Sequence, residues 1–377
     1  MTGLDRKIKV LTVFGTRPDA IKMATVVLEL RRCADKVDLK VAVTGQHREM
    51  LDQVLSTFEI VPDYDLKIMQ PRQSLFDITM RVLTGMERVL EESQPDIVLA
   101  QGDTTTTFAA ALAAFYKKVA FGHVEAGLRT ANKYDPFPEE MNRRLASQLT
   151  DLHFAPTQAA VDNLIREGIS AEKISVTGNT VIDALLVVAQ RTYQFEDESI
   201  AKACSSKKMI LVTAHRRENW GEPMQDVCRA IKRILREHPE ANVIFPVHRN
   251  PIVRDAVFPE LQNEERVLLI EPPEYVPFVH LMKSAYLILS DSGGVQEEAP
   301  SLGKPVLVLR RTTERPEGVS AGSAKLVGTD ADVIVEETNR LLNNSADYQR
   351  MAQVKNPYGD GKAAEKIAKA IFSYYGL

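Results

Sequence analysis

The sequence predicts an α/β fold of two doubly wound, Rossmann-like domains that face each other across a cleft. Short apolar runs alternate with helical patterns in both halves of the chain, which is typical of parallel sheets covered by helices on both faces. The length of 377 residues suits two domains better than one. A polar stretch at residues 190–208 interrupts the alternation, so we place the boundary there, between domains 1–188 and 189–360.

The first half alternates strands and helices from its beginning. Apolar runs predict strands at residues 9–14, 39–44, 97–101 and 119–124. Helical periodicity predicts helices at 18–33, 48–58, 74–92, 105–116 and 138–149, with further short elements up to about residue 186. Each strand is expected to carry functional residues at its carboxyl end, because ligands bind there in open α/β sheets.

The second half repeats the pattern. The predicted strands are 209–213, 242–246, 267–270, 285–290 and 305–309. The predicted helices are 223–238, 275–284, 295–302, 331–342 and 361–375. Periodicity alone does not assign the last helix to either domain.

Composition excludes several classes of protein. A net charge of −4 argues against a general nucleic-acid binder. The three cysteines, Cys33, Cys204 and Cys228, have no metal-ligand spacing, so we expect reduced thiols in a cytoplasmic protein, with no structural metal and no cofactor. No apolar stretch is long enough for a signal-peptide core or a membrane span, so we expect no membrane partner.

The most informative loop is the DSGGVQEE segment at residues 291–298, which lies between a predicted buried strand and a predicted helix. Free backbone N–H groups and the positive end of a helix dipole gather at such a turn. Gly293 and Gly294 would let the backbone approach a ligand closely, and Glu298, in the opening turns of the helix, could reach a ribose. The pattern indicates a nucleoside diphosphate site, although Gly-Gly turns are also common where the glycines serve only the geometry of the turn.

The loop after the first strand carries two cations, Arg17 and Lys22, that could face an anionic ligand. It matches neither the dinucleotide-binding fingerprint nor the P-loop. The alternative is a capped helix with two surface cations.

Acidic residues follow later strands of the first half. Asp103 lies at a strand tip, as catalytic carboxylates often do, but could equally be a helix N-cap. Glu125 would be costly to bury alone, so a neighbouring arginine could pair with it, in a structural or a catalytic role. Glu139 and Glu140 begin a helix; a dipole match explains Glu140 and leaves Glu139 open.

The second half offers cations at its strand tips. These are His215 and Arg216 after one strand, His248 after the next, and Arg315 in the loop after residue 309. A cationic domain opposite an acidic one suggests that one holds a pyrophosphate while the other handles protons on the attached group.

Together the loops resemble those of the bacterial non-hydrolysing UDP-N-acetylglucosamine (UDP-GlcNAc) 2-epimerases. The matching motifs, in order between residues 14 and 361, are FGTRPDAIK, QGDTTTT, GHVEAGLRT, PFPEEMNRR, TAHRRENWGEP, DSGGVQEEAPSLGKPVLVLR, TTERPEG and NPYGDG. The resemblance implies a glycosyltransferase type B fold, in which the C-terminal helix 361–377 joins the first domain, and a homodimer. It also implies reversible conversion of UDP-GlcNAc to UDP-ManNAc for cell-surface polysaccharide synthesis, by anti elimination of UDP to 2-acetamidoglucal and re-addition.

The resemblance also implies roles for individual residues. The acid/base carboxylates would be Asp103, Glu125 and Glu139, supported by Lys22, Arg143 and His215. The UDP site would comprise Arg17, His215, Ser292, Gly293, Gly294, Glu298 and Arg315. A second UDP-GlcNAc, acting as an allosteric activator, would bind at Gln46, Arg72, Arg216 and His248.

Two positions depart from the family pattern. Glu49 replaces a glutamine beside the activator site, where a carboxylate could weaken the second sugar nucleotide. Asp19 replaces a glutamate in the first turn of a helix, for which we expect a mild effect.

Three other functions compete with this one. The first is a hydrolysing epimerase that releases ManNAc and UDP, and the second is a retaining glycosyltransferase of the same fold. The third is a non-catalytic UDP-sugar sensor, against which the joint presence of the three carboxylates argues.

Overall fold

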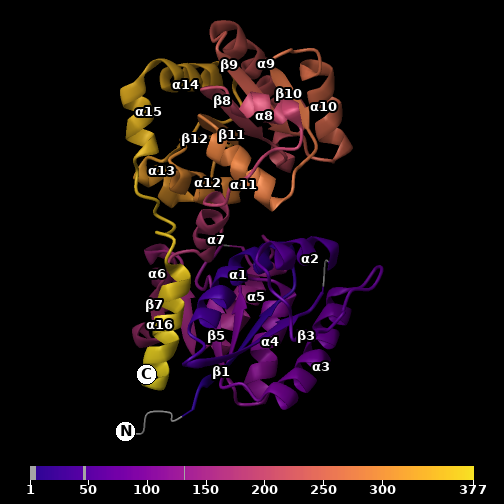
Figure 1. Ribbon diagram of the computed structural model, residues 1–377, viewed down its shortest axis with the longest axis vertical. Coiled ribbons are helices and arrows are strands. Elements are labelled where there is room, and N and C mark those ends of the chain that lie inside the picture. The colour runs from indigo at the N-terminus through magenta and orange to yellow at the C-terminus, as the bar shows by residue number, and fades with distance from the viewer. Residues whose placement is uncertain (1–5, 46–47, 131) are drawn as a thin grey trace. The chain divides into compact units, whose positions relative to one another are not determined.

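The computed structural model describes residues 6–45, 48–130 and 132–377 and divides into two compact units (Figure 1). Unit 1 comprises Met1–Ala184 and Gly359–Leu377, and unit 2 comprises Leu185–Tyr358. The division falls inside helix α7 (Thr180–Ala189). The polar stretch 190–208, where we expected the boundary, therefore lies within unit 2, and helix α8 (Glu198–Cys204) is part of it.

Unit 1 is built on a seven-stranded parallel sheet in the order β3-β2-β1-β4-β5-β6-β7. Its strands are β1 (Ile8–Phe14), β2 (Val37–Val43), β3 (Tyr64–Asp65), β4 (Ile97–Gln101), β5 (Ala120–Val124), β6 (Leu152–Ala155) and β7 (Ile174–Val176). Its helices are α1 (Arg17–Arg32), α2 (Arg48–Thr57), α3 (Leu75–Ser93), α4 (Thr105–Tyr116), α5 (Glu139–Leu149), α6 (Gln158–Arg166), the 3₁₀ turn η1 (Ala171–Lys173) and α16 (Ala363–Tyr375).

Local signals explain where the helices of unit 1 begin. Thr16 and Asp19 form a reciprocal capping box at the start of α1, and Ser74 and Asp77 form another at the start of α3. Strand β4 is buried along its whole length, which matches its uninterrupted apolar sequence. These caps and buried strands fix the loops that leave the carboxyl edge of the sheet.

The C-terminal helix α16 belongs to unit 1 and packs on α1 (Figure 1). The carboxylate of Asp183, on α7, accepts hydrogen bonds from the backbone N–H groups of Ala363 and Ala364 at 3.2 and 2.9 Å. Because these are orphan donors of the first helical turn, Asp183 caps α16 from another helix. Burial is the largest influence on this carboxyl and raises its pKa to about 6.

Unit 2 is built on a six-stranded parallel sheet in the order β10-β9-β8-β11-β12-β13. Its strands are β8 (Lys208–Thr213), β9 (Ala241–Pro246), β10 (Val267–Ile270), β11 (Leu287–Ser290), β12 (Val306–Val308) and β13 (Ala324–Leu326). Besides α8 it contains the helices and turns η2 (Arg217–Asn219), α9 (Glu222–Glu237), α10 (Pro251–Leu261), α11 (Tyr275–Ser284), α12 (Gly293–Glu298), η3 (Ala299–Leu302), α13 (Pro316–Ala321), α14 (Ala331–Asn343) and α15 (Ser345–Ala352).

The prediction of two parallel-sheet α/β domains is confirmed, with local differences. The segment 295–302, predicted as one helix, is instead α12 followed by the 3₁₀ turn η3. Pro300 lies in η3 and has no N–H to donate, so it interrupts the α-helical hydrogen bonds there. Helix α10 was not predicted at all.

Each sheet reverses its strand order at one point, between β1 and β4 in unit 1 and between β8 and β11 in unit 2. Ligands bind at such switch points, outside the carboxyl ends of the strands. The loops after β1, β4, β8 and β11 are therefore the first places to look for a site. No helix in the described part of the chain is both long and apolar enough to cross a membrane.

Candidate functional site

The switch point of unit 1 is formed by loops that approach each other closely. A Cβ atom added at Gly15, after β1, would lie 2.2 Å from Thr44 Oγ1 and 2.7 Å from Thr106 Oγ1. Only glycine fits there, and it allows the loop that carries Arg17 to lie against the loop that carries Asp103. Arg17 is half-buried and makes no ion pair with the described residues.

Glu125 is the central carboxylate of unit 1. It directly follows β5, is buried, and has a left-handed backbone with φ of +63°. Lys22 Nζ lies 2.7 Å from both carboxylate oxygens, Gln101 donates to Oε2, and Asn179 Nδ2 donates to Oε1 at 2.9 Å. The expected partner was an arginine; the structure corrects this to Lys22, because the second turn of α1 carries that side chain to the tip of β5.

Asp103 forms a second ion pair in the same unit. Its Oδ2 lies 2.5 Å from Arg143 Nη2, and its backbone carbonyl accepts from Asn142 Nδ2 at 2.9 Å. The N-cap of α4 is Thr104, so the alternative N-cap role for Asp103 is wrong. Asp103 is thus held by α5, which begins at Glu139.

Glu139 and Glu140 differ sharply although they are adjacent. Glu140 is fully buried and pairs with Arg144 at 2.8 Å and with Arg143 at 3.4 Å, and it also accepts from the Thr130 N–H. Glu140 therefore has a structural role, which consists of these ion pairs and this hydrogen bond as well as the match to the helix dipole. Glu139 is half-buried and makes no ion pair with the described residues, so its carboxylate is available for other chemistry.

Asp19 is an additional acid beside this group. Its Oδ2 accepts from the Thr16 N–H and from Thr104 Oγ1, each at 3.3 Å, and so joins the loops after β1 and β4. Burial raises the pKa of Asp19 to about 7, with hydrogen bonds from Thr16 acting in the opposite direction. Asp19 therefore titrates close to neutral pH.

The switch point of unit 2 is organised by Asp291, which directly follows β11 and is fully buried. Its Oδ2 accepts from the backbone N–H groups of His215 and Arg216, both at 2.8 Å, and from Asn219 Nδ2 at 2.9 Å. Burial opposes ionisation of Asp291, but the hydrogen bond and charge of His215 and these N–H groups outweigh it and lower its pKa. The carboxylate thereby fixes the shape of the loop after β8.

The Ser-Gly-Gly turn lies between two cations. A Cβ atom added at Gly293 would lie 3.9 Å from Arg216 Nη2 and 4.0 Å from Arg315 Cγ, so the space over this glycine is open and flanked by arginines. Arg315 is held by Glu297, and its carbonyl accepts from Tyr358 Oη at 3.0 Å. Open backbone beside two arginine side chains suits a phosphate.

Glu298 lies at the end of α12, and not in the opening turns of a longer helix as expected. A Cβ added at Gly294 would nevertheless lie 3.8 Å from Glu298 Oε2. Side chains tilt toward the N-terminus of a helix, so a residue four positions later covers the first turn. Ser292 is the N-cap residue of α12, and its side chain makes no capping hydrogen bond.

The four residues expected to bind a second nucleotide lie in different places. In unit 2, the rings of His215 and His248 stack with centroids 5.6 Å apart, and Arg216 Nη1 lies 3.7 Å from Glu314. Arg72 belongs to unit 1 and is exposed. Gln46 lies outside the described residues, as does the side chain of Glu49.

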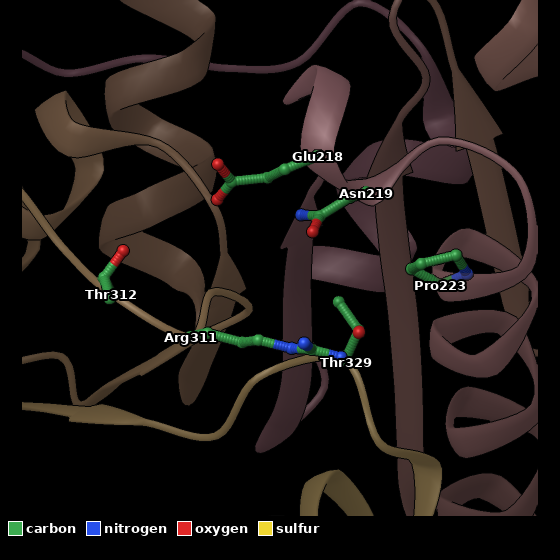
Figure 2. Close-up of a pocket in the computed structure, with 6 residues that line it drawn as sticks. All are labelled: Glu218, Asn219, Pro223, Arg311, Thr312 and Thr329. Carbon is green, nitrogen blue, oxygen red and sulfur yellow. The ribbon is translucent and has the colours of Figure 1, made fainter.

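A cavity of about 310 Å³ lies beside the Asp291 network in unit 2. Figure 2 shows Glu218 and Asn219 on one side of it and Arg311 extending toward Thr329 on the other. Among the described residues, no group of three or more histidine, cysteine or acidic side chains could hold a metal ion.

Sequence reasoning gave no role to several residues that complete these networks: Gln101 and Asn179 in unit 1, and Asn219, Asp291 and Tyr358 in unit 2. Most of them lie inside the motifs that carry the family resemblance, beside residues that were assigned. Asn179 does not, although its place after Gly178 and before an apolar helix is a signal for an N-cap.

Comparisons with known proteins point to one family. Residues 29–372 match the family model described as UDP-N-acetylglucosamine 2-epimerase. The chain is 54% identical over 370 residues to the Escherichia coli K12 protein of that name, covering 97% of this chain and 98% of the relative. It is 53% identical over 371 residues to the Bacillus subtilis protein, covering 98% and 97%. The crystal structure of UDP-GlcNAc 2-epimerase from Neisseria meningitidis bound to UDP-GlcNAc matches with 52% identity and a TM-score of 0.83, covering 97% of this chain and all of that one (100%).

Replacing Asp19 by asparagine should remove a pH dependence of stability. The folded-state pKa of Asp19 is raised from 3.8 to about 7, so its contribution is fully present below pH 3.8 and is lost as the pH rises through 7. Between pH 5 and 8 the free energy of unfolding of the unaltered protein should fall by about 2–3 kcal/mol more than that of Asp19→Asn. Urea unfolding at several pH values measures this.

Asp77→Asn is the matched control, because Asp77 occupies the same capping-box position in α3 but is only half-buried, and its pKa is lowered chiefly by the Ser74 N–H. It should leave the fall between pH 5 and 8 in place. Equal pH dependence in the unaltered protein and in Asp19→Asn would contradict the expectation.

Proposed function

The chain belongs to the UDP-N-acetylglucosamine 2-epimerase family, and we propose that it interconverts UDP-GlcNAc and UDP-ManNAc by inverting C2 of the sugar. The observation that carries the proposal is the grouping of Asp103 and Glu125 at the carboxyl edge of the unit 1 sheet, each held by a cation. Glu139 begins α5, the helix that holds Asp103.

The chemistry needs carboxylates because C2–H is not adjacent to a carbonyl group. Departure of UDP from C1 develops positive charge at that carbon and makes the C2 proton acidic. A carboxylate takes the proton as the C1–O bond breaks, which gives 2-acetamidoglucal and UDP. A proton is then returned to the opposite face of C2, and UDP adds back to C1, so all atoms are conserved.

Asp103, Glu125 and Glu139 are the proposed acid/base groups, with Lys22 and Arg143 supporting two of them. Lys22 is bound to both oxygens of Glu125, and Arg143 to Asp103. Glu139 makes no such pair with the described residues, so its protonation can change without disrupting an ion pair. It is therefore the best supported proton carrier of the three.

Unit 2 is proposed to hold UDP throughout the reaction. The open backbone at Ser292, Gly293 and Gly294 accepts the diphosphate between Arg216 and Arg315. Glu298 takes the ribose hydroxyls, and His215 binds the pyrophosphate. UDP must be retained after the C1–O bond breaks, because the product forms only when it adds back.

We further propose that a second UDP-GlcNAc activates the enzyme through Gln46, Arg72, Arg216 and His248. The stacking of His248 on His215 supports this, since it links a proposed activator residue to a proposed UDP residue.

A cytoplasmic location is proposed because Cys33, Cys204 and Cys228 are all free thiols, as a reducing compartment would keep them. The ManNAc is proposed to enter cell-surface polysaccharide.

Incubation with UDP-GlcNAc in D₂O, followed by NMR, tests the reaction. The unaltered protein should form UDP-ManNAc with deuterium at C2 of both sugars. Asp103→Asn, Glu125→Gln and Glu139→Gln should each bind UDP but exchange C2 about 10²–10⁴-fold more slowly, which is the usual worth of acid–base catalysis.

Glu91→Gln, which removes only a surface ion pair with Lys117, is the control and should exchange normally. Free ManNAc and UDP as the main products would favour the hydrolysing reaction. Absence of any change at C2 would remove the epimerase assignment and leave a UDP-sugar sensor.

Replacing Gly293 by alanine should weaken UDP binding without unfolding the protein. The added Cβ has no neighbour nearer than 3.9 Å, and alanine suits the first turn of a helix, so the melting temperature should not fall. It would occupy the space proposed for the phosphate, and we expect the dissociation constant for UDP to rise about tenfold or more by calorimetry. Uridine, which lacks phosphate, is the control ligand; unchanged UDP affinity would place the diphosphate elsewhere.

We also propose that the protein is a homodimer that pairs through an apolar patch on unit 1. This patch comprises Phe76, Met80 and Leu83 of α3 with Tyr116 of α4; Phe76 is 82% exposed and Met80 59%. Leu83 and Tyr116 line one groove between the two helices. Contiguous exposed apolar side chains of this kind mark interaction sites.

Phe76→Asp should convert the dimer to a monomer, because a charge would be buried without a partner. Light scattering should report about 84 kDa for the unaltered protein, twice the 42.1 kDa chain, and about half of that for the variant. Val61→Asp, at another exposed apolar residue of unit 1, should stay dimeric. A Phe76→Asp protein that stays dimeric would exclude this patch.

A further inference from the structure

Asn179 is a buried amide that the proposed chemistry does not use. It is 2% exposed and lies between Gly178 and the first residue of α7. Its Nδ2 donates to Glu125 Oε1 at 2.9 Å, while its Oδ1 accepts from the backbone N–H of Val181 at 3.1 Å. Both ends of one amide are therefore engaged, one by a helix and one by a proposed acid/base carboxylate.

These two bonds fix the direction of the amide. The Val181 N–H can only donate, so the atom facing it must be the oxygen, and the nitrogen must then face Glu125. A rotated amide would lose both hydrogen bonds and bring its oxygen toward a carboxylate. The start of α7 thus delivers a donor to Glu125 in a defined orientation.

The second neutral donor, Gln101, reaches the other oxygen of the same carboxylate. One amide on each oxygen fixes the plane of the Glu125 carboxylate, which Lys22 alone does not, since it lies 2.7 Å from both oxygens. Lys22 is also the more exposed partner, with 19% of its side chain accessible. The lysine thus balances the charge of Glu125, and the two amides fix the orientation of its carboxylate.

The backbone of Asn179 is held as well. A Cβ added at Gly359, the first residue of unit 1 after the chain returns from unit 2, would lie 3.4 Å from the Asn179 backbone nitrogen. Gly359 has φ of +152°, which residues with a Cβ rarely adopt, so the returning chain needs a glycine where it packs beside Asn179. Asn179 is therefore fixed by Val181, by Glu125 and by the returning chain.

We propose that Asn179 is a positioning residue that holds the Glu125 carboxylate ionised and in its reactive orientation during the C2 epimerisation. This inference rests on the proposed function. The left-handed backbone of Glu125 supports it, because such strain in a residue other than glycine persists only where surrounding contacts enforce it. Hydrogen bonds to a carboxylate stabilise its charged form and limit its rotation.

Two substitutions separate this role from the capping of α7. Asn179→Ser and Asn179→Asp both keep an oxygen that can accept from the Val181 N–H. Serine has a shorter side chain that lacks the amide Nδ2 donating to Glu125, and aspartate replaces that donor with a second negative charge. Asn344 offers matched controls, since it caps α15 through Ala346 and Asp347 and is not part of the site.

We expect kcat for UDP-GlcNAc to fall about 10- to 100-fold in Asn179→Ser, the worth of one hydrogen bond to a charged group, and further in Asn179→Asp. KM should stay near its original value, because UDP is held by other residues. The acidic limb of the kcat/KM profile should move to higher pH in Asn179→Asp, since a like charge disfavours ionisation of Glu125. Asn344→Ser and Asn344→Asp should change neither kcat nor the profile.

The test is to measure kcat, KM, the pH profile and the melting temperature of all four variants. A normal kcat in Asn179→Ser and Asn179→Asp would overturn the inference. So would a loss of kcat that follows the melting temperature with no movement of the pH profile, because that is the signature of a capping role alone. Failure of the unaltered protein to exchange C2 would instead overturn the proposed function, so the two failures are distinct.

Discussion

The negative charge of Glu125, buried at the tip of β5, is the constraint around which unit 1 is arranged. An isolated carboxylate in such a place would be strongly destabilising, so partners must reach it from elsewhere in the chain. Lys22 comes from α1, Gln101 from the end of β4 and Asn179 from the start of α7. Three separate elements must therefore converge before this carboxylate can be buried.

Unit 2 solves a similar problem with different partners. Asp291 is also buried at a strand tip, but its oxygen is bound mainly by backbone N–H groups and by an asparagine. Such partners fix the path of the loop after β8, while the ring of His215 contacts the other oxygen of Asp291 at 3.2 Å and Arg216 lies 3.7 Å from Glu314. Glu125 is thus held by side chains from three separate elements, whereas Asp291 orders a loop that carries cations.

The sequence predicted most strands and the polar loops correctly, because apolar periodicity and strand-tip chemistry are local signals. It missed helix α10, which contains Pro259 and so reads as interrupted, although Pro251 lies at the start of the helix, where proline is well tolerated. The sequence also led us to extend α12 through Pro300. The helical periodicity continues past this residue, although the α-helical hydrogen bonds do not.

The residues that hold the candidate site residues in place were harder to predict than the candidate site residues themselves. Glu125 could be recognised as a carboxylate in need of a cation, but arginine or lysine could not be chosen without knowing which helix face meets β5. Asn179 lies far from Glu125 in the sequence, and only the adjacency of β5, β6 and β7 in one sheet brings them together. The sequence shows where polar residues occur, whereas the order of the strands in the sheet decides which of them come into contact.

The chain enters unit 2 after Ala184 and leaves it at Tyr358, so unit 2 is one continuous segment inserted into unit 1. Helix α16, which packs on α1 and is capped by Asp183, is synthesised only after all of unit 2. On the ribosome, the synthesis of unit 1 consequently begins before that of unit 2 and is completed after it. Unit 2 has all of its strands available earlier, whereas α1 must wait for its packing partner α16 until unit 2 has been synthesised.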